Sequence, residues 1–417
     1  MSNSLLKTLK SLRGNSKACV YCEPFFGISI ALILPYGSVY MLAMGLEDVQ
    51  VGFIAMVFML AQVCSAFFSG TITDKLGRRK TTAIFDFIAF CIPCLIWWQA
   101  TNFWFFLAAA IVNGCNQVVI NSYNCLLIED AEASQITGIK SLSLIAAQFS
   151  SFLGPLIVIL LTRFGLVETM HILYRYAFVM MSIKITLTYI FTRETKMGVI
   201  RLAETKGKSI FSLAAGYTGV FKIIRQSGGT IFALAISIIV GIVMMINSTF
   251  WQVIISQRLL VPVQFLPFFP LLRAIMIIVF LFFIGPAMTK SGLKFPLLTG
   301  FICFFLGQLI LILIPIHSSA LYFLICISLV FDGFGFGALN MLARSLIALN
   351  VNAAERARVM AILNVIIMSF TAPFGWIAGF LSSLSRTYPF ILNLFLLCTG
   401  FLVTMLYYGN KKKQSII

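Results

Sequence analysis

Residues Gly70–Lys80 read GTITDKLGRRK and join two long apolar segments. Gly70 lets two helices approach closely, and Gly77 permits a tight turn. Asp74 is an anion placed to meet a cation or the positive end of a neighbouring helix. A connection this short and this basic, set between apolar segments, predicts a sharp turn between two membrane helices.

The composition of the chain indicates an integral membrane protein. Its 417 residues are 60% hydrophobic and only 10% charged, with a mean hydropathy of +1.01, which excludes a soluble domain. A bilayer core needs about 20 apolar residues per helix, and we predict an all-α fold with twelve transmembrane helices. The predicted spans are Phe25–Gly45, Val51–Ile72, Thr82–Trp98, Phe103–Leu127, Ser141–Leu161, Ile172–Phe191, Phe232–Ile255, Phe265–Met288, Phe295–Pro315, Leu321–Leu346, Val359–Leu381 and Phe390–Tyr408. The first span is too long for a cleaved signal peptide.

The distribution of basic residues predicts the orientation. Of the 30 lysines and arginines, 24 fall in the two ends and the alternate connections that share a side with the N-terminus, and only four fall in the opposite connections. Basic connections stay on the cytoplasmic side, so both termini are expected there, in a cell inner (plasma) membrane. The net charge of +17 therefore follows from topology, and no nucleic-acid partner is expected.

In this setting the 70–80 run resembles the loop motif between helices 2 and 3 of the major facilitator superfamily of secondary transporters. The resemblance implies two six-helix pseudo-repeats that rock around a central path lined by helices 1, 4, 7 and 10. It also implies that the run gates the inner side, with Asp74 facing the start of helix 11 near Arg358. Asp86, one turn inside helix 3, is expected to pair with the hinge arginines. The predicted gating residues are Gly70, Asp74, Lys75, Gly77, Arg78, Arg79, Asp86 and Arg358.

The chain divides into two related halves. We predict an N-terminal bundle over residues 1–192, a cytoplasmic linker over 193–229 and a C-terminal bundle over 230–417, with an amphipathic helix within Ile210–Ile224. The run GPAMTKSGLK at Gly285–Lys294 repeats the hinge pattern, and Asn113-Gly114 in helix 4 is echoed by Asp332-Gly333 in helix 10. Such parallel repeats indicate duplication of a six-helix unit.

Helix 4 concentrates carboxamides on one face. The five carboxamides Asn113, Asn116, Gln117, Asn121 and Asn124 fall on one arc at about 100° per residue. Such a face lines either a water-filled cavity or a helix interface, and the number of amides favours the cavity. Matching groups occur in the other three helices that the resemblance places around the path. The predicted cavity residues are Tyr36, Tyr40, Asn113, Asn116, Gln117, Asn121, Asn247, Trp251 and Asn340.

Asp332 lies close to the predicted midplane in helix 10. An unpaired carboxyl there favours its neutral form and suits a proton-coupling site. The alternative is a structural ion pair with Arg273 of helix 8, which could also hold an anionic substrate. Lys184 lies near enough to the inner end of helix 6 to snorkel. Glu23, before Pro24, is expected to act as a cap or gate at the entry to helix 1.

These features predict a secondary active transporter that is coupled to protons and moves a small polar solute as a monomer in the lipid bilayer. There is no phosphate loop, so we expect no ATP hydrolysis, no enzyme activity and no cofactor. The two CxxC pairs have no histidine partners, so no metal site is expected. One alternative is efflux of drugs or lipophilic compounds, although Ala110 stands where proton-driven exporters of the superfamily carry an arginine. Another is a non-transporting receptor or lipid scramblase.

Overall fold

The computed structural model describes residues 9–132, 135–209, 228–279, 293–350 and 356–414, and the elements in these ranges are helical. Contacts divide the chain into two compact units. Unit 1 comprises residues 1–46 and 57–216, and unit 2 comprises residues 47–56 and 217–417. The helix α4 therefore begins among residues of unit 2 and continues into unit 1. Each unit is described by itself below.

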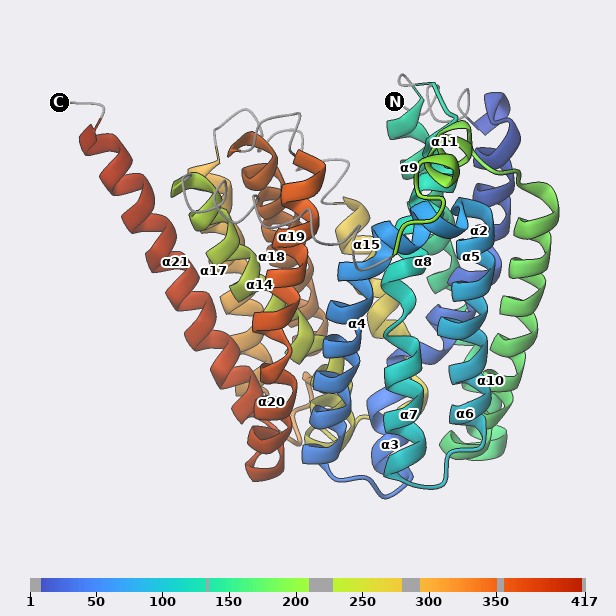
Figure 1. Ribbon diagram of the computed structural model, residues 1–417. Helices are drawn as coiled ribbons and strands as arrows, with labels where there is room; N and C mark the ends of the chain where they lie inside the picture. The colour runs from blue at the N-terminus through green and yellow to red at the C-terminus, as the bar shows by residue number, and fades with distance from the viewer. Residues whose placement is uncertain (1–8, 133–134, 210–227, 280–292, 351–355, 415–417) are drawn as a thin grey trace. The chain divides into compact units, whose positions relative to one another are not determined.

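Unit 1 is a bundle of helices in which α2 and α10 lie side by side (Figure 1). Its helices are α2 (Gly14–Ile33), α3 (Gly37–Ala43), most of α4 (Asp48–Leu76), α5 (Arg78–Asp86), α6 (Ile92–Trp98), α7 (Phe103–Asn113), α8 (Asn116–Ile128), α9 (Ile136–Phe149), α10 (Ile157–Phe191) and α11 (Lys196–Glu204). Several predicted spans are interrupted. A 3₁₀ turn containing Pro35 separates α2 from α3, and a π-helical turn over Phe87–Cys91 separates α5 from α6. Proline removes a helical hydrogen bond, which explains the first break.

Unit 2 is built around the packing of α17 on α18, with α14 and α21 against the same pair (Figure 1). Its helices are α14 (Gly228–Val253), α15 (Phe268–Val279), α17 (Lys294–Leu313), α18 (Leu321–Asn350), α19 (Arg356–Thr371), α20 (Pro373–Leu384) and α21 (Tyr388–Gln414). The core contains Phe232, Phe301, Phe304 and Leu339, each at most 5% exposed. The unit therefore has an apolar interior of its own.

The described residues contain ten helices that are long and apolar enough to cross a membrane. This number is consistent with twelve predicted spans for two reasons. The predicted spans Ser141–Leu161 and Ile172–Phe191 meet at a kink where Gly165 has non-helical dihedral angles, with φ of +73°, and the continuous segment Phe152–Phe191 across this kink counts as one of the ten. The predicted span Phe265–Met288 extends beyond residue 279, where the described range ends.

Two other expectations fall partly outside the described residues. The predicted amphipathic segment Ile210–Ile224 lies outside them, and so does most of the second hinge run, Gly285–Lys294. The predicted linker nevertheless begins with a well-formed helix, α11. Thr195 caps it by accepting a hydrogen bond from the backbone N–H of Gly198.

Glycines bring α17 and α18 close together in unit 2. A Cβ added at Gly335 would lie 2.6 Å from the backbone nitrogen of Phe304. A Cβ added at Gly307 would lie 2.8 Å from the backbone nitrogen of Asp332 and from the carbonyl oxygen of Ser328. Small residues permit this approach where lipid provides no hydrophobic drive between helices. The same close packing holds Asp332 against α17.

Gly335→Ala is expected to destabilise the protein, because the new methyl group would overlap backbone atoms of α17. Overpacking of this kind costs about 1–3 kcal/mol. We expect a lower thermal midpoint of the purified protein in detergent. Gly409→Ala is the matched control, since no atom lies within 4 Å of its added Cβ. Equal midpoints for the two variants would contradict the close-packing argument.

Candidate functional site

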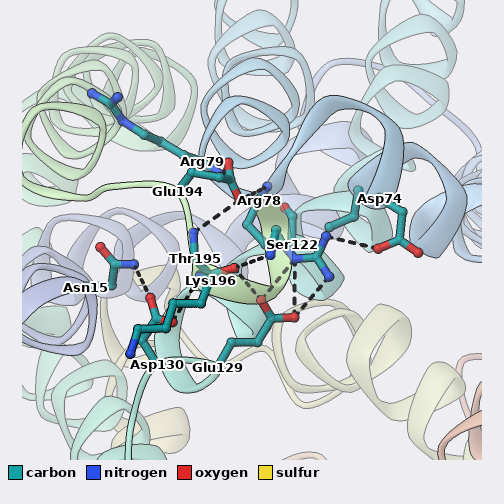
Figure 2. A network of polar contacts seen from close by, with 12 residues as sticks. Asn15, Asp74, Arg78, Arg79, Ser122, Glu129, Asp130, Glu194, Thr195 and Lys196 are labelled. Atoms are coloured by element: carbon teal, nitrogen blue, oxygen red, sulfur yellow. Dashed lines mark hydrogen bonds and ion pairs between the residues drawn. The ribbon is translucent and has the colours of Figure 1, made fainter. Parts of the chain in front are cut away.

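The 70–80 run forms a tight turn between α4 and α5 in unit 1. Gly77 has φ of +83°, as predicted for this turn. The N-terminus of α5 is capped by a residue far away in sequence: the Glu194 carboxylate accepts the backbone N–H groups of Arg78 at 2.8 Å and of Arg79 at 3.1 Å (Figure 2). A carboxylate at this position is stabilised by the positive end of the helix. A Cβ on Gly198 would overlap this carboxylate, so the glycine leaves room for it.

Arg78 joins three segments of unit 1. Its guanidinium donates from Nε and Nη2 to the Glu129 carboxylate at 3.0 and 3.1 Å, and its Nη1 lies 3.0 Å from Asp74 Oδ1 (Figure 2). The Arg78 side chain is only 5% exposed. A planar guanidinium that meets a carboxylate through two hydrogen bonds is the strongest form of ion pair in proteins. Arg78 therefore ties the turn to the end of α8.

The linker docks on the same end of unit 1. Thr195 Oγ1 donates to Glu129 at 2.5 Å, and the backbone N–H of Lys196 donates to Asp130 at 3.1 Å. Asn15, in the first turn of α2, exchanges two hydrogen bonds with the backbone of Arg193. It also donates to Asp130 at 3.4 Å (Figure 2). We call this group the basic-end network: Asn15, Asp74, Arg78, Glu129, Asp130, Glu194 and Thr195. It fastens α11 across the ends of α2, α5 and α8.

The network lowers the pKa of Glu129. Burial opposes ionisation of this carboxyl, but the hydrogen bonds from Arg78 and Thr195, together with the Arg78 charge, outweigh burial and hold the pKa below its ordinary value. The ionised form of Glu129 is thus the one that holds the network together.

Other predicted gating residues have different surroundings. Arg79 donates to the carbonyl oxygen of Tyr189 at 2.9 and 2.7 Å and stacks on the ring of that residue. Lys75 is exposed, and Gly70 lies inside α4. Arg358 belongs to α19, but its side chain lies outside the described residues. The predicted contact between Asp74 and the start of helix 11 therefore stays a prediction.

The expected pairing of Asp86 with the hinge arginines is wrong. Asp86 forms an ion pair with Lys184 of α10, and both side chains are buried. The snorkelling expected of Lys184 is wrong for the same reason, since its ammonium points into the bundle. Both hinge arginines have nearer acceptors at the turn, and a buried ammonium requires a counter-charge inside the bundle.

The carboxamides of helix 4 bond within unit 1. Asn113 donates to the carbonyl oxygen of Ala89 at 2.7 Å, Asn121 donates to Thr73 at 3.1 Å, and Asn116 accepts from Gln62 at 3.0 Å. Gln117 is half-buried and makes no side-chain hydrogen bond with the described residues. Asn124 donates to the carbonyl oxygen of Ile120 in its own helix at 2.7 Å. Three of the five amides thus bond to other helices, as the helix-interface alternative expects, and a role on the transport path stays a prediction.

The aromatic residues predicted to line the cavity are buried. Tyr40 is 0% exposed and packs against Phe106 and Tyr174 of its own bundle, with its hydroxyl 3.3 Å from the carbonyl oxygen of Trp97. Tyr36 is also 0% exposed, and its hydroxyl has no partner among the described residues. In unit 2, Trp251 is buried against Phe269, and Asn340 is half-buried on α18.

Asp332 is the centre of a buried polar network in unit 2. Its Oδ1 accepts from Gln308 Nε2 at 2.8 Å and lies 3.4 Å from Asn247 Nδ2, while Oδ2 lies 3.1 Å from Arg273 Nη2. The Asp332 side chain is 2% exposed and that of Arg273 is 25% exposed. The pair has ion-pair distance without hydrogen-bond alignment, so Oδ2 has no hydrogen-bond donor in the described part of the chain.

Sequence reasoning missed several residues of these networks. Gln308 of α17 donates to Asn247 at 3.2 Å and accepts from Asn393 of α21 at 3.1 Å, so the Asp332 network, with Arg273, extends across five helices. A single amide in an otherwise apolar predicted span is the signal that could have indicated Gln308 and Asn393. Asp48 and Arg386 form an ion pair in unit 2 next to Ser382. Glu129 and Glu194 were also missed, although acids that flank basic connections on the same side could have indicated them.

Acid should weaken the basic-end network. Because Glu129 has a folded-state pKa below its ordinary value of 4.5, its contribution to stability is complete above pH 4.5 and is lost as the pH falls through the lowered value. We therefore expect Glu129→Gln to lower the thermal midpoint at neutral pH and the gap to the wild type to close in acid. Exposed Glu132→Gln is the control. A gap that does not change with pH would contradict the assignment.

The comparisons with known proteins agree with this architecture. The sequence profile described as Major Facilitator Superfamily matches residues 25–281 and 234–416. A search of curated proteins gives no significant match. The fold is similar to the crystal structure of the nucleoside transporter NupG, with a TM-score of 0.74 at 13% identity, covering 95% of this chain and 99% of that one.

Two further solved structures share the fold. A POT family transporter in complex with a thioalcohol-conjugated peptide has a TM-score of 0.71 at 15% identity, covering 97% of this chain and 99% of that one. The human organic anion transporter MFSD10 has a TM-score of 0.59 at 14% identity, covering 93% and 98%. At these identities the likeness establishes the fold alone. With the profile match over nearly the whole length, the chain belongs to the Major Facilitator Superfamily.

Proposed function

We propose that this multi-pass membrane protein is a secondary active transporter that moves a small polar solute by alternating access and couples that movement to protons. The observation that carries the proposal is the Asp332 network: a buried acid, an arginine on a neighbouring helix and three amides. Ionisable groups inside membrane bundles are costly and mark ion or substrate pathways. The excess of basic residues on one side supports an inner (plasma) membrane with both termini cytoplasmic.

The geometry at Asp332 suits reversible protonation. Oδ1 accepts a hydrogen bond from Gln308, whereas Oδ2 faces only Arg273 among the described residues, so Oδ2 is the oxygen that can take a proton. Protonation removes the negative charge and frees the guanidinium, which is partly exposed and lies 5.1 Å from the ring of Phe336. The ion pair joins α15 to α18 when charged and no longer does so when Asp332 is neutral. Proton binding thereby changes the force between two helices.

The substrate class follows from hydrogen-bonding groups. Gln117 of unit 1 is half-buried and has no side-chain hydrogen bond with the described residues, which favours a solute with hydrogen-bonding groups. NupG transports nucleosides and the POT family transporter was solved with a peptide conjugate, so nucleosides, short peptides and sugars form the first panel of solutes to test.

Uptake of these solutes into proteoliposomes under an imposed pH gradient of either sign tests the proposal. If the vesicles transport only lipophilic compounds, in the direction opposite to the flow of protons, the result supports drug efflux instead.

Asp332→Asn should separate two activities. Once a solute is found, the variant is expected to lose gradient-driven accumulation yet keep counterflow, because exchange needs binding and rocking without a net proton step. A purely structural ion pair predicts another result: loss of both activities, with partial recovery when Arg273 is also neutralised, since the unpaired buried charge does the damage. Full gradient-driven uptake by the single variant would exclude both roles.

We also propose that the 70–80 run gates the inner side through Asp74. In unit 1 this carboxylate is 35% exposed and lies 3.0 Å from Arg78 Nη1 at the end of the bundle. Asp74→Asn is expected to shift the resting state toward opening on the inner side. Accessibility of cysteines introduced on each face would report the shift. Glu204→Gln removes an exposed ion pair nearby and serves as the control. Unchanged labelling in the Asp74 variant would exclude the gating role.

A further inference from the structure

Unit 1 contains a second group of charges, away from the basic-end network, in which Asp86 and Lys184 are buried and Glu23 is half-buried. Glu23 of α2, Asp86 of α5, Tyr123 of α8 and Lys184 of α10 meet inside the bundle. Lys184 and Asp86 are 4% and 2% exposed and form an ion pair. The Lys184 ammonium also lies 4.9 Å from the centre of the Tyr123 ring. The group therefore holds two carboxyls and one ammonium.

Glu23 is the carboxyl of this group that forms no ion pair of its own with the described residues. The ammonium of Lys184 is engaged by Asp86, and no cation in the described residues lies within ion-pair distance of Glu23. The other titratable groups near it are the thiols of Cys19 and Cys22 on its own helix, 0% and 5% exposed, and the phenol of Tyr123. An ionised Glu23 would leave this part of the bundle with a net negative charge, which is costly in a low-dielectric interior.

The number of hydrogens available for the contacts of the Tyr123 hydroxyl also favours a neutral Glu23. Its hydroxyl oxygen lies 2.5 Å from Glu23 Oε2 and 3.0 Å from the carbonyl oxygen of Cys19. A phenol has one hydrogen, while a carbonyl and an ionised carboxylate only accept. With Glu23 ionised, one of the two short contacts would lack a hydrogen. With Glu23 protonated, its O–H donates to Tyr123 and Tyr123 donates to Cys19, so each contact has one.

We propose that Glu23 is a proton-binding site of unit 1, protonated in this structure. On release, the proton passes from the carboxyl oxygen to water, and the carboxylate then accepts the Tyr123 hydroxyl and faces the ammonium of Lys184. Pro24 follows directly and cannot donate to the carbonyl oxygen of Val20, so the helix lacks one bond where the carboxyl must move. The proposal does not depend on Asp332 or on any substrate, because Asp332 lies in the other unit.

Infrared spectroscopy of the full-length protein in lipid vesicles tests this without a transport assay. At neutral pH we expect a carboxylic-acid C=O band that disappears on alkaline titration as a carboxylate band grows. Glu23→Gln should lose the band and retain the fold, because a carboxamide can still donate to the Tyr123 oxygen. Glu132→Gln, which changes an exposed acid, should keep the band, and Asp332→Asn distinguishes any separate band from unit 2. The same acid bands in the wild type and Glu23→Gln would overturn the proposal.

A second variant covers the case in which Glu23→Gln fails to fold. Tyr123→Phe keeps the carboxyl but removes the oxygen that its O–H meets, so the C=O band should shift in frequency. Lys184 and Asp86 are untouched by this change. An unshifted band in Tyr123→Phe would show that the acid lies elsewhere and would also overturn the proposal.

Discussion

Charges buried in a membrane-spanning bundle must find their partners inside that bundle, because hydrocarbon offers neither water nor counter-ions. Both units of this protein obey the constraint. In unit 1, Lys184 is buried with Asp86, and in unit 2, Arg273 faces Asp332. Removing one partner of such a pair costs about 3–5 kcal/mol, whereas the intact pair adds little net stability. Buried pairs of this kind are therefore better explained by what they do when one charge is neutralised than by a contribution to folding.

The acids inside the two units, Glu23 and Asp332, have different surroundings. Asp332 has an arginine and several amides around it, so its charge is compensated and its proton would break an ion pair. Glu23 has a phenol and a carbonyl but no cation of its own, so its proton completes a chain of hydrogen bonds. Protonation of Asp332 would break its ion pair with Arg273, whereas protonation of Glu23 would add a hydrogen bond to Tyr123. Protonation at the two sites would thus have opposite mechanical effects on the helices that carry them.

At the basic end of unit 1, the geometry of the turn between α4 and α5 depends on residues from the linker. Glu194 caps α5, and Thr195 and Arg78 share the carboxylate of Glu129. The first residues of the linker after α10 are consequently part of the bundle. The composition of this segment predicted only a polar connection. This arrangement makes the turn rigid, since the orphan N–H groups of α5 are satisfied by a side chain that is itself held by α11.

The sequence alone determined the class of the protein. Apolar run lengths, the basic asymmetry and the 70–80 motif predicted a helical membrane fold of the superfamily, because span length and hydropathy depend only on the order of residues along the chain. Periodicity also placed the amides of helix 4 on one face. Pairing, in contrast, depends on which helices are neighbours and how they are rotated. The tertiary structure decided that Asp86 meets Lys184 and not the hinge arginines, that Gln308 and Asn393 join Asp332, and that Glu194 caps α5. These contacts join residues as far as 116 positions apart in the sequence. Only the packing of the helices brings such residues within hydrogen-bond distance.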